Sequence, residues 1–93
     1  MRIIGTIDHP TWKITLFKMD NKFSIKFEDR FLEQTYKFRE GEQLPDEAAL
    51  RQLVDDHFLQ SVQLEFESMQ RVHQQVLDNH PRNAGDADFP EII

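Results

Sequence analysis

Two groups of side chains have residue types that could do chemistry, and both lie in the second half of the chain. His57 and Ser61 are four residues apart, which brings side chains together on one face of a helix, and Asp55 and Asp56 come directly before them. A hydroxyl, an imidazole and a carboxylate are the parts of a nucleophilic site. The acid must orient the histidine, however, and immediate neighbours on a helix point in different directions. We therefore interpret His57 as a boundary histidine beside a small residue. An enzyme site at a dimer cleft around His57 or His73 is the alternative.

Metal-binding residues are also present near the end of the chain. His73, Asp78 and His80 offer imidazole and carboxylate ligands that suit zinc or a similar ion. The histidines are seven residues apart, and no pattern such as HExxH accompanies them. Three later residues lack the length and the terminal glutamate of a calcium loop: Asn83, Asp86 and Asp88. The three glycines are isolated, so they form no phosphate loop. We expect no metal, cofactor or catalytic site.

The sharpest candidate for binding is a mixture of basic and aromatic residues on one face of a predicted sheet. Such faces hold single-stranded RNA or DNA through phosphate contacts and base stacking. The residues are Phe17, Phe31, Lys13, Lys26 and Lys37, with Arg2, Lys22, Ile4 and Met19 around them. Glu28 and Glu33 lie opposite two of these lysines, and the net charge is −6. Nucleic-acid binding is therefore an alternative function and not the expected one.

Charge and composition narrow the class of protein. Residues 1–39 hold eight Lys and Arg against five acids, whereas residues 40–93 hold three against twelve. The absence of cysteine excludes disulfides and thiolate metal sites. The N-terminus does not look like a signal peptide, and no apolar run approaches the length of a membrane-spanning helix. We expect a cytoplasmic protein that has no contact with a membrane.

The elements that position these residues begin with strands. From Arg2 to Phe38, apolar and polar residues alternate, and Ile, Phe, Thr and Trp are enriched. Two-residue turns at 20–21 and 29–30, and a four-residue loop at 8–11, predict an antiparallel sheet in the order 1-2-3-4. The expected neighbours are Leu16 with Ile25, Phe27 with Leu32, Lys26 with Glu33, Ile7 with Trp12 and Ile3 with Leu16. Gln34 is the one polar residue on the core face, and we expect it to hydrogen-bond the helix, with a ligand contact as the alternative.

Residues 46–79 contain no Pro and no Gly and predict one helix of about 50 Å. Asp46 can cap its start, and Pro81 ends it. At about 100° per residue, the apolar side chains fall into two clusters roughly 100° apart. The first is Leu50, Leu53, Val54, Phe58 and Leu64, and the second is Val62, Phe66, Met69, Val72 and Val76. Because a strand of eight residues spans only about 26 Å, the sheet can cover about half of this helix.

The second cluster is spaced almost like a coiled-coil seam, so another surface must bury it. The simplest supplier is a second copy of the chain in a two-fold arrangement. We therefore expect a homodimer whose interface is Val62, Phe66, Met69, Val72 and Val76. The alternative is a break near Gln60-Ser61 that folds the helix back on its own sheet, although no Gly or Pro marks one there.

Residues 80–93 contain Gly85 and two prolines and predict an irregular tail. Its last five residues are apolar enough to dock in a groove beside the helices or on the sheet edge of a partner. A disordered tail is the equal alternative.

Three segments, 4–10, 13–15 and 36–41, resemble small hypothetical proteins of Bacteroides-type bacteria. These proteins have no assigned activity, so the resemblance implies a bacterial, cytoplasmic origin and no site residues.

The sequence thus predicts a single α+β domain, residues 1–93, in which a four-stranded antiparallel meander (1–38) packs on one long C-terminal helix (46–79). The expected function is that of a small, homodimeric, non-enzymatic interaction or regulatory module, which could also bind another protein. Single-stranded nucleic-acid binding and an enzyme site at the dimer cleft are the alternatives.

Overall fold

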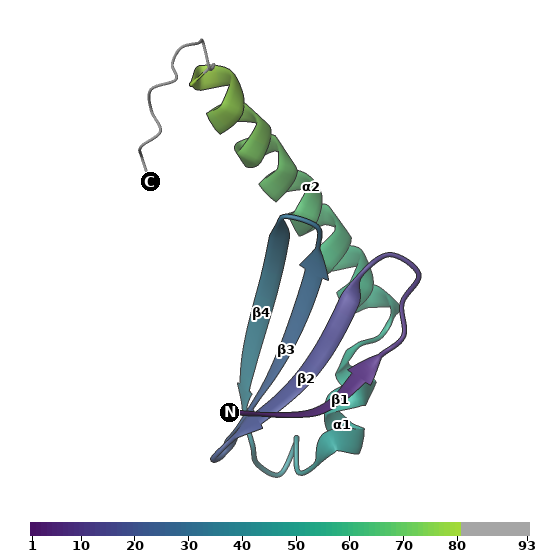
Figure 1. Cartoon of the computed structure of the whole chain (residues 1–93). Coiled ribbons are helices and arrows are strands. Elements are labelled where there is room, and N and C mark those ends of the chain that lie inside the picture. The colour runs from purple at the N-terminus through teal and green to yellow at the C-terminus, as the bar shows by residue number, and fades with distance from the viewer. Residues whose placement is uncertain (81–93) are drawn as a thin grey trace.

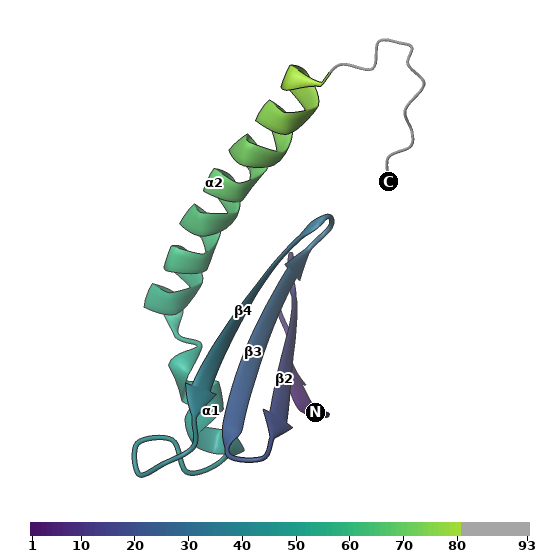
Figure 2. The ribbon, with the colours of Figure 1, turned by 90° about the vertical axis from the view of Figure 1, so that its left-hand side faces the viewer.

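The computed structural model describes residues 1–80. Four strands, β1 (Arg2–Ile7), β2 (Lys13–Met19), β3 (Lys22–Asp29) and β4 (Leu32–Arg39), form an antiparallel sheet in the order β1-β2-β3-β4. Two helices follow, α1 (Glu47–Leu53) and α2 (Asp56–Asn79), and both lie on the same side of the sheet (Figures 1 and 2). The predicted α+β fold is confirmed. The tail predictions concern residues that lie outside this description, except for His80.

The hydrophobic core lies between the sheet and the two helices. The central strands contribute the fully buried residues Leu16, Ile25 and Phe27, and the helices contribute Leu50 and Val62. The apolar residues of these strands alternate towards the helices, as expected for a sheet that is covered on one face, while Thr15 and Ser24 are buried between them on the opposite face. Aromatic rings join the layers. The ring of Trp12 lies 5.3 Å from that of Phe66 in α2.

The hairpin between β2 and β3 has the predicted register. Leu16 pairs with Ile25 across a two-residue turn whose first residue, Asp20, has a φ of 54°. Aspartate tolerates this left-handed conformation better than most residues.

The register predicted for β3 and β4 is wrong by two residues. Phe27 pairs with Gln34 instead of Leu32, because the turn is Arg30-Phe31, where Arg30 has a φ of 56°. A turn that moves by one residue shifts the register by two and leaves every side chain on its original face. The apolar pattern therefore could not distinguish the two turns. Lys26 consequently faces Thr35 and not Glu33.

The pairing of β1 with β2 also differs from the prediction. Ile7 lies opposite Ile14 and not Trp12, because six residues (8–13) connect this pair instead of the four that were expected. His9 organises this loop, since its Nδ1 accepts hydrogen bonds from the backbone N–H groups of Thr11 and Trp12, both at 3.1 Å. A β-bulge between Ile3 and Gly5 then moves Ile3 off the core face and leaves it exposed.

The single helix predicted for residues 46–79 is interrupted at Val54 and Asp55. The break is neither absent nor at Gln60-Ser61, the two possibilities raised by the sequence. Asp46 caps α1 as predicted, with Oδ1 accepting from the N–H of Ala49 at 3.0 Å. Asp55 caps α2 in the same way, accepting from the N–H of Phe58 at 2.9 Å. With the break, Leu50 of α1 and both Val62 and Phe66 of α2 reach the same hydrophobic core.

Candidate functional site

The second half of α2 extends past the sheet, and Figure 2 shows its C-terminal end beyond the tip of the β3–β4 hairpin. Every residue from Gln70 to His80 is exposed. Three apolar side chains in this stretch remain more than half exposed: Val72 (57%), Val76 (53%) and Leu77 (54%). An isolated helical stretch of this length is marginally stable in water. This overhang is therefore the part of the described chain that most needs a covering surface.

The five residues of the predicted interface fall into two groups, one covered by the sheet and one at or beyond its end. Val62 and Phe66 are buried in the chain's own core, so the prediction that they face a second copy is wrong. Met69 is partly buried at the margin of that core. Met69, Val72 and Val76 fall within about 60° of one another around α2 and form what we call the exposed stripe.

Two exposed leucines that were outside the predicted interface flank this stripe. Leu64 and Leu77 each lie about 110° from its centre, on opposite sides of α2. Leu64 belonged to the cluster that the sequence assigned to the sheet. The break before α2 turns it to solvent instead.

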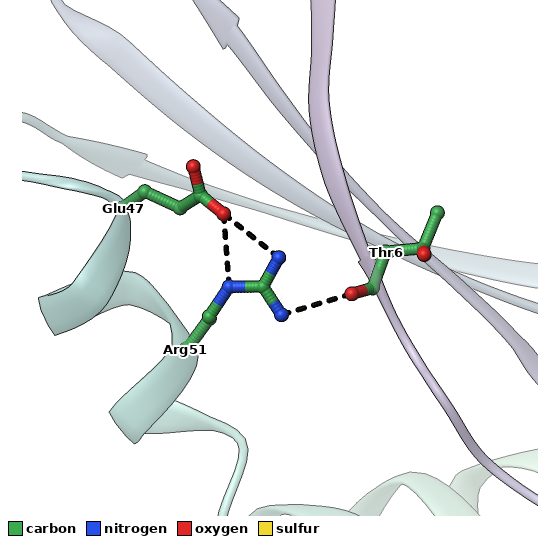
Figure 3. Close-up of polar contacts among 3 residues, drawn as sticks. All are labelled: Thr6, Glu47 and Arg51. Atoms are coloured by element: carbon green, nitrogen blue, oxygen red, sulfur yellow. Dashed lines mark hydrogen bonds and ion pairs between the residues drawn. The ribbon is translucent and has the colours of Figure 1, made fainter.

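The start of the helical segment is fixed to the sheet by a polar contact (Figure 3). Arg51 forms an ion pair with Glu47, with 2.7 Å between Nη2 and Oε2, and donates a hydrogen bond from Nη1 to the backbone oxygen of Thr6 at 2.9 Å. A Cβ at Gly5 would collide with these two side chains. The absence of a side chain at Gly5 therefore leaves room for this ion pair beside the edge strand β1.

A second polar contact holds α2 on the sheet. The Nε2 of Gln34 donates to the backbone oxygen of Val62 at 3.1 Å, and the hydroxyl of Tyr36 donates to the Oε1 of Gln34. Burial raises the pKa of Tyr36 above its ordinary value, and the negative charge of Glu65 raises it further. The predicted contact between Gln34 and the helix is confirmed. It fixes the direction in which α2 leaves the sheet.

A groove of about 550 Å³ separates the tip of the β3–β4 hairpin from α2. Phe31 projects from the tip, is 85% exposed and stacks on His73, with 6.0 Å between the ring centres and 8° between the planes. Arg71 and Leu77 also line the groove. Phe31 thus belongs to a turn beside the helix and not to the outer sheet face where the sequence placed it.

The remaining residues of the predicted nucleic-acid face do share one side of the sheet. The Nζ of Lys26 lies 5.4 Å from the centre of the Phe17 ring and 3.8 Å from a carboxylate oxygen of Glu28. Lys13 and Lys37 are exposed. The aromatic ring and the central lysine of this face are therefore already engaged with each other.

The groups with catalytic residue types do not assemble as a site requires. The hydroxyl of Ser61 donates to the backbone oxygen of His57 at 3.1 Å, which is a contact within the helix. The carboxylate of Asp55 is used in capping. Within residues 1–80, no three His, Asp or Glu side chains are grouped as a metal ion would need.

The chain was compared with protein-family models, with curated proteins and with solved structures, and none of them matches it. No helix in residues 1–80 is both long enough and apolar enough to cross a membrane.

Proposed function

We propose that this protein is a non-enzymatic interaction module that works as a homodimer, and that the exposed stripe of α2 is its interface. The observation that carries the proposal is the overhang: every described residue after Met69 is exposed, and Val72 and Val76 remain more than half exposed. Complete burial of a fully exposed valine contributes roughly 1.5–3 kcal/mol, so covering the remaining half of Val72 or Val76 contributes about half of that. Four such side chains, two from each copy, would supply a substantial part of the binding free energy.

A second copy is the simplest partner for the stripe. A two-fold axis brings the same surface from both chains together, so an apolar stripe meets an apolar stripe without a second gene product. The spacing of three residues from Met69 to Val72 and four from Val72 to Val76 is that of interlocking helical side chains. The contact between Gln34 and Val62 supports this role, because it anchors the first half of α2 to the sheet.

Two arrangements weigh against the nucleic-acid alternative. Phe31 does not contribute to the outer sheet face, and Lys26 is engaged with Phe17 and Glu28. The enzymatic alternative lacks a supporting contact, since Ser61 bonds the backbone of His57 and not its ring.

The test is sedimentation equilibrium of Val72→Asp and Val76→Asp beside a matched control, Leu64→Asp. All three changes place a carboxylate on an exposed apolar position of α2, but only the first two lie on the stripe. We expect both stripe variants to weaken dimerisation by a hundredfold or more, since a buried unpaired charge costs several kcal/mol, and Leu64→Asp to remain dimeric. Far-ultraviolet circular dichroism would check that each variant folds. Equal behaviour of all three variants would defeat the proposal.

A further inference from the structure

We infer that the two copies associate with their α2 helices antiparallel and cross near Val72. The inference rests on the proposed function, because it specifies the geometry of the same dimer. Val72 is the middle residue of the exposed stripe, so a crossing at this point lets Met69 and Val76 of both copies contribute equally. The direction of the pairing is set by charge and by the position of the sheet.

The first argument is the position of Glu65. Residues 65, 69, 72, 76 and 79 follow the alternating four- and three-residue spacing of a coiled-coil seam, and Glu65 occupies its first exposed place. In a parallel pair in register, each seam residue faces its own counterpart, so two Glu65 carboxylates would meet. Like charges directly opposite each other destabilise a helical pair. In an antiparallel pair that crosses at Val72, each Glu65 lies instead at the level of Asn79 of the other helix, with His80 as the next residue.

The second argument concerns the end of α2. The last turn of α2 contains no basic residue that would balance the partial negative charge of a helix C-terminus. A parallel pair would place two such ends side by side. An antiparallel pair separates the two ends by roughly the length of the paired segment. The charges at the end of α2 therefore favour the antiparallel direction.

The third argument comes from the sheet. Val62, the seam position before Glu65, is buried against the chain's own strands, so a parallel seam cannot continue in that direction. In the antiparallel arrangement, the tip of each α2 runs towards the sheet of the other copy. The last turns of one helix then lie beside the turn from Glu65 to Met69 of the other, where the core ends. Each overhang thus gains a surface that a parallel pair does not offer.

The orientation can be measured by spin labels, since the chain has no cysteine that would interfere. Gln60→Cys and Gln74→Cys place one label each on exposed positions of α2 that lie about 150° or more from the centre of the stripe. In an antiparallel pair centred on Val72, the two labels at residue 60 are about 36 Å apart along the axis, and those at residue 74 about 6 Å. The two labels are also separated sideways, across the pair, by a similar distance at both positions. With this sideways separation included, we expect the label-to-label distance at residue 60 to exceed that at residue 74 by roughly 15 Å.

Each outcome of this measurement decides between arrangements. Nearly equal distances at the two positions, in a sample whose mass is that of a dimer, would overturn the antiparallel pairing and leave the dimer intact. A monomeric mass with no dipolar coupling at either position would overturn both proposals.

Glu65→Gln gives an independent check on the same inference. If the pair is antiparallel, Glu65→Gln should not lower the dissociation constant of the dimer. Parallel pairing predicts tighter association, by roughly twofold or more, because a repulsion is relieved. Tighter association of Glu65→Gln would therefore contradict the inference.

Discussion

At the scale of single residues, glycine and glutamine positions determine how closely the helices approach the sheet. Gly5 leaves room for the ion pair of Arg51 and Glu47, and Gln34 reaches the backbone of Val62. Gln34 could be predicted from the sequence, because a lone polar residue on an apolar face needs a hydrogen-bond partner. The partner of Gly5 could not be predicted, since the bulge that aligns β1 with α1 leaves no clear pattern in the sequence.

Gly5→Ala should destabilise the fold. The added methyl group meets the ends of the flexible, partly exposed side chains of Arg51 and Glu47, so the ion pair must move, at a cost of about 1 kcal/mol or less. Gly41→Ala is the matched control, because a Cβ at that position meets nothing within 4 Å. Urea unfolding, followed by Trp12 fluorescence at a fixed protein concentration, measures both. Equal free energies of unfolding for the two variants would show that the ion pair does not limit the approach of α1.

Tyr36 is the only tyrosine, so its titration can be followed by ultraviolet absorbance. We expect a midpoint above the ordinary value of 10.0 in the folded protein, and a return to that value in urea. Because the folded pKa is raised, the stability that Tyr36 contributes is complete below the unfolded pKa and is lost as pH rises through the folded pKa.

The charge of Glu65 can be separated from burial by the variant Glu65→Gln, which should lower the midpoint of Tyr36 part of the way. Burial is the larger cause, so a raised midpoint should persist in the variant. A midpoint that does not respond to this change would mean that Glu65 does not lie close to Tyr36.

At the scale of elements, the sequence predicted the strands and helices better than it predicted the turns and the break between the helices. Alternation identified the four strands and their core face, except at the start of β1, where the bulge turns Ile3 outward. The turn at Arg30-Phe31 could not be separated from one at Asp29-Arg30, because both keep the same residues on the core face. The break at Val54-Asp55 did leave a signal, since Asp55-Asp56 repeats the pattern of Asp46-Glu47 at a helix start. Because residues 46–79 contain no Gly or Pro, the sequence nevertheless predicted one continuous helix.

Asp55→Ala should therefore weaken α2 at its start. The side chain satisfies a backbone N–H that has no partner within the helix, and loss of such a cap costs about 1 kcal/mol. Asp55→Asn removes the charge but keeps a capping oxygen, so it should retain most of the stability. Thermal unfolding by circular dichroism compares the two variants. If the asparagine variant lost as much stability as the alanine variant, capping would not be the role of this residue.

At the scale of the whole molecule, the shape follows from the difference in length between the sheet and the longer helix α2. The described chain measures 55 × 27 × 20 Å, and its long dimension comes from α2 extending past the sheet (Figure 2). The sequence predicted this overhang from lengths alone. It did not predict that Val62 and Phe66 would be retained by the chain's own core, because that depends on the direction set by the break.

The mass of the unmodified protein in solution tests the central claim most directly. Light scattering during size-exclusion chromatography at tens of micromolar should give a mass twice the 11.1 kDa of one chain. The mass should fall towards that of one chain as the sample is diluted. A mass of one chain at every concentration up to this range would contradict the account, since the exposed stripe would then remain in water without a partner copy.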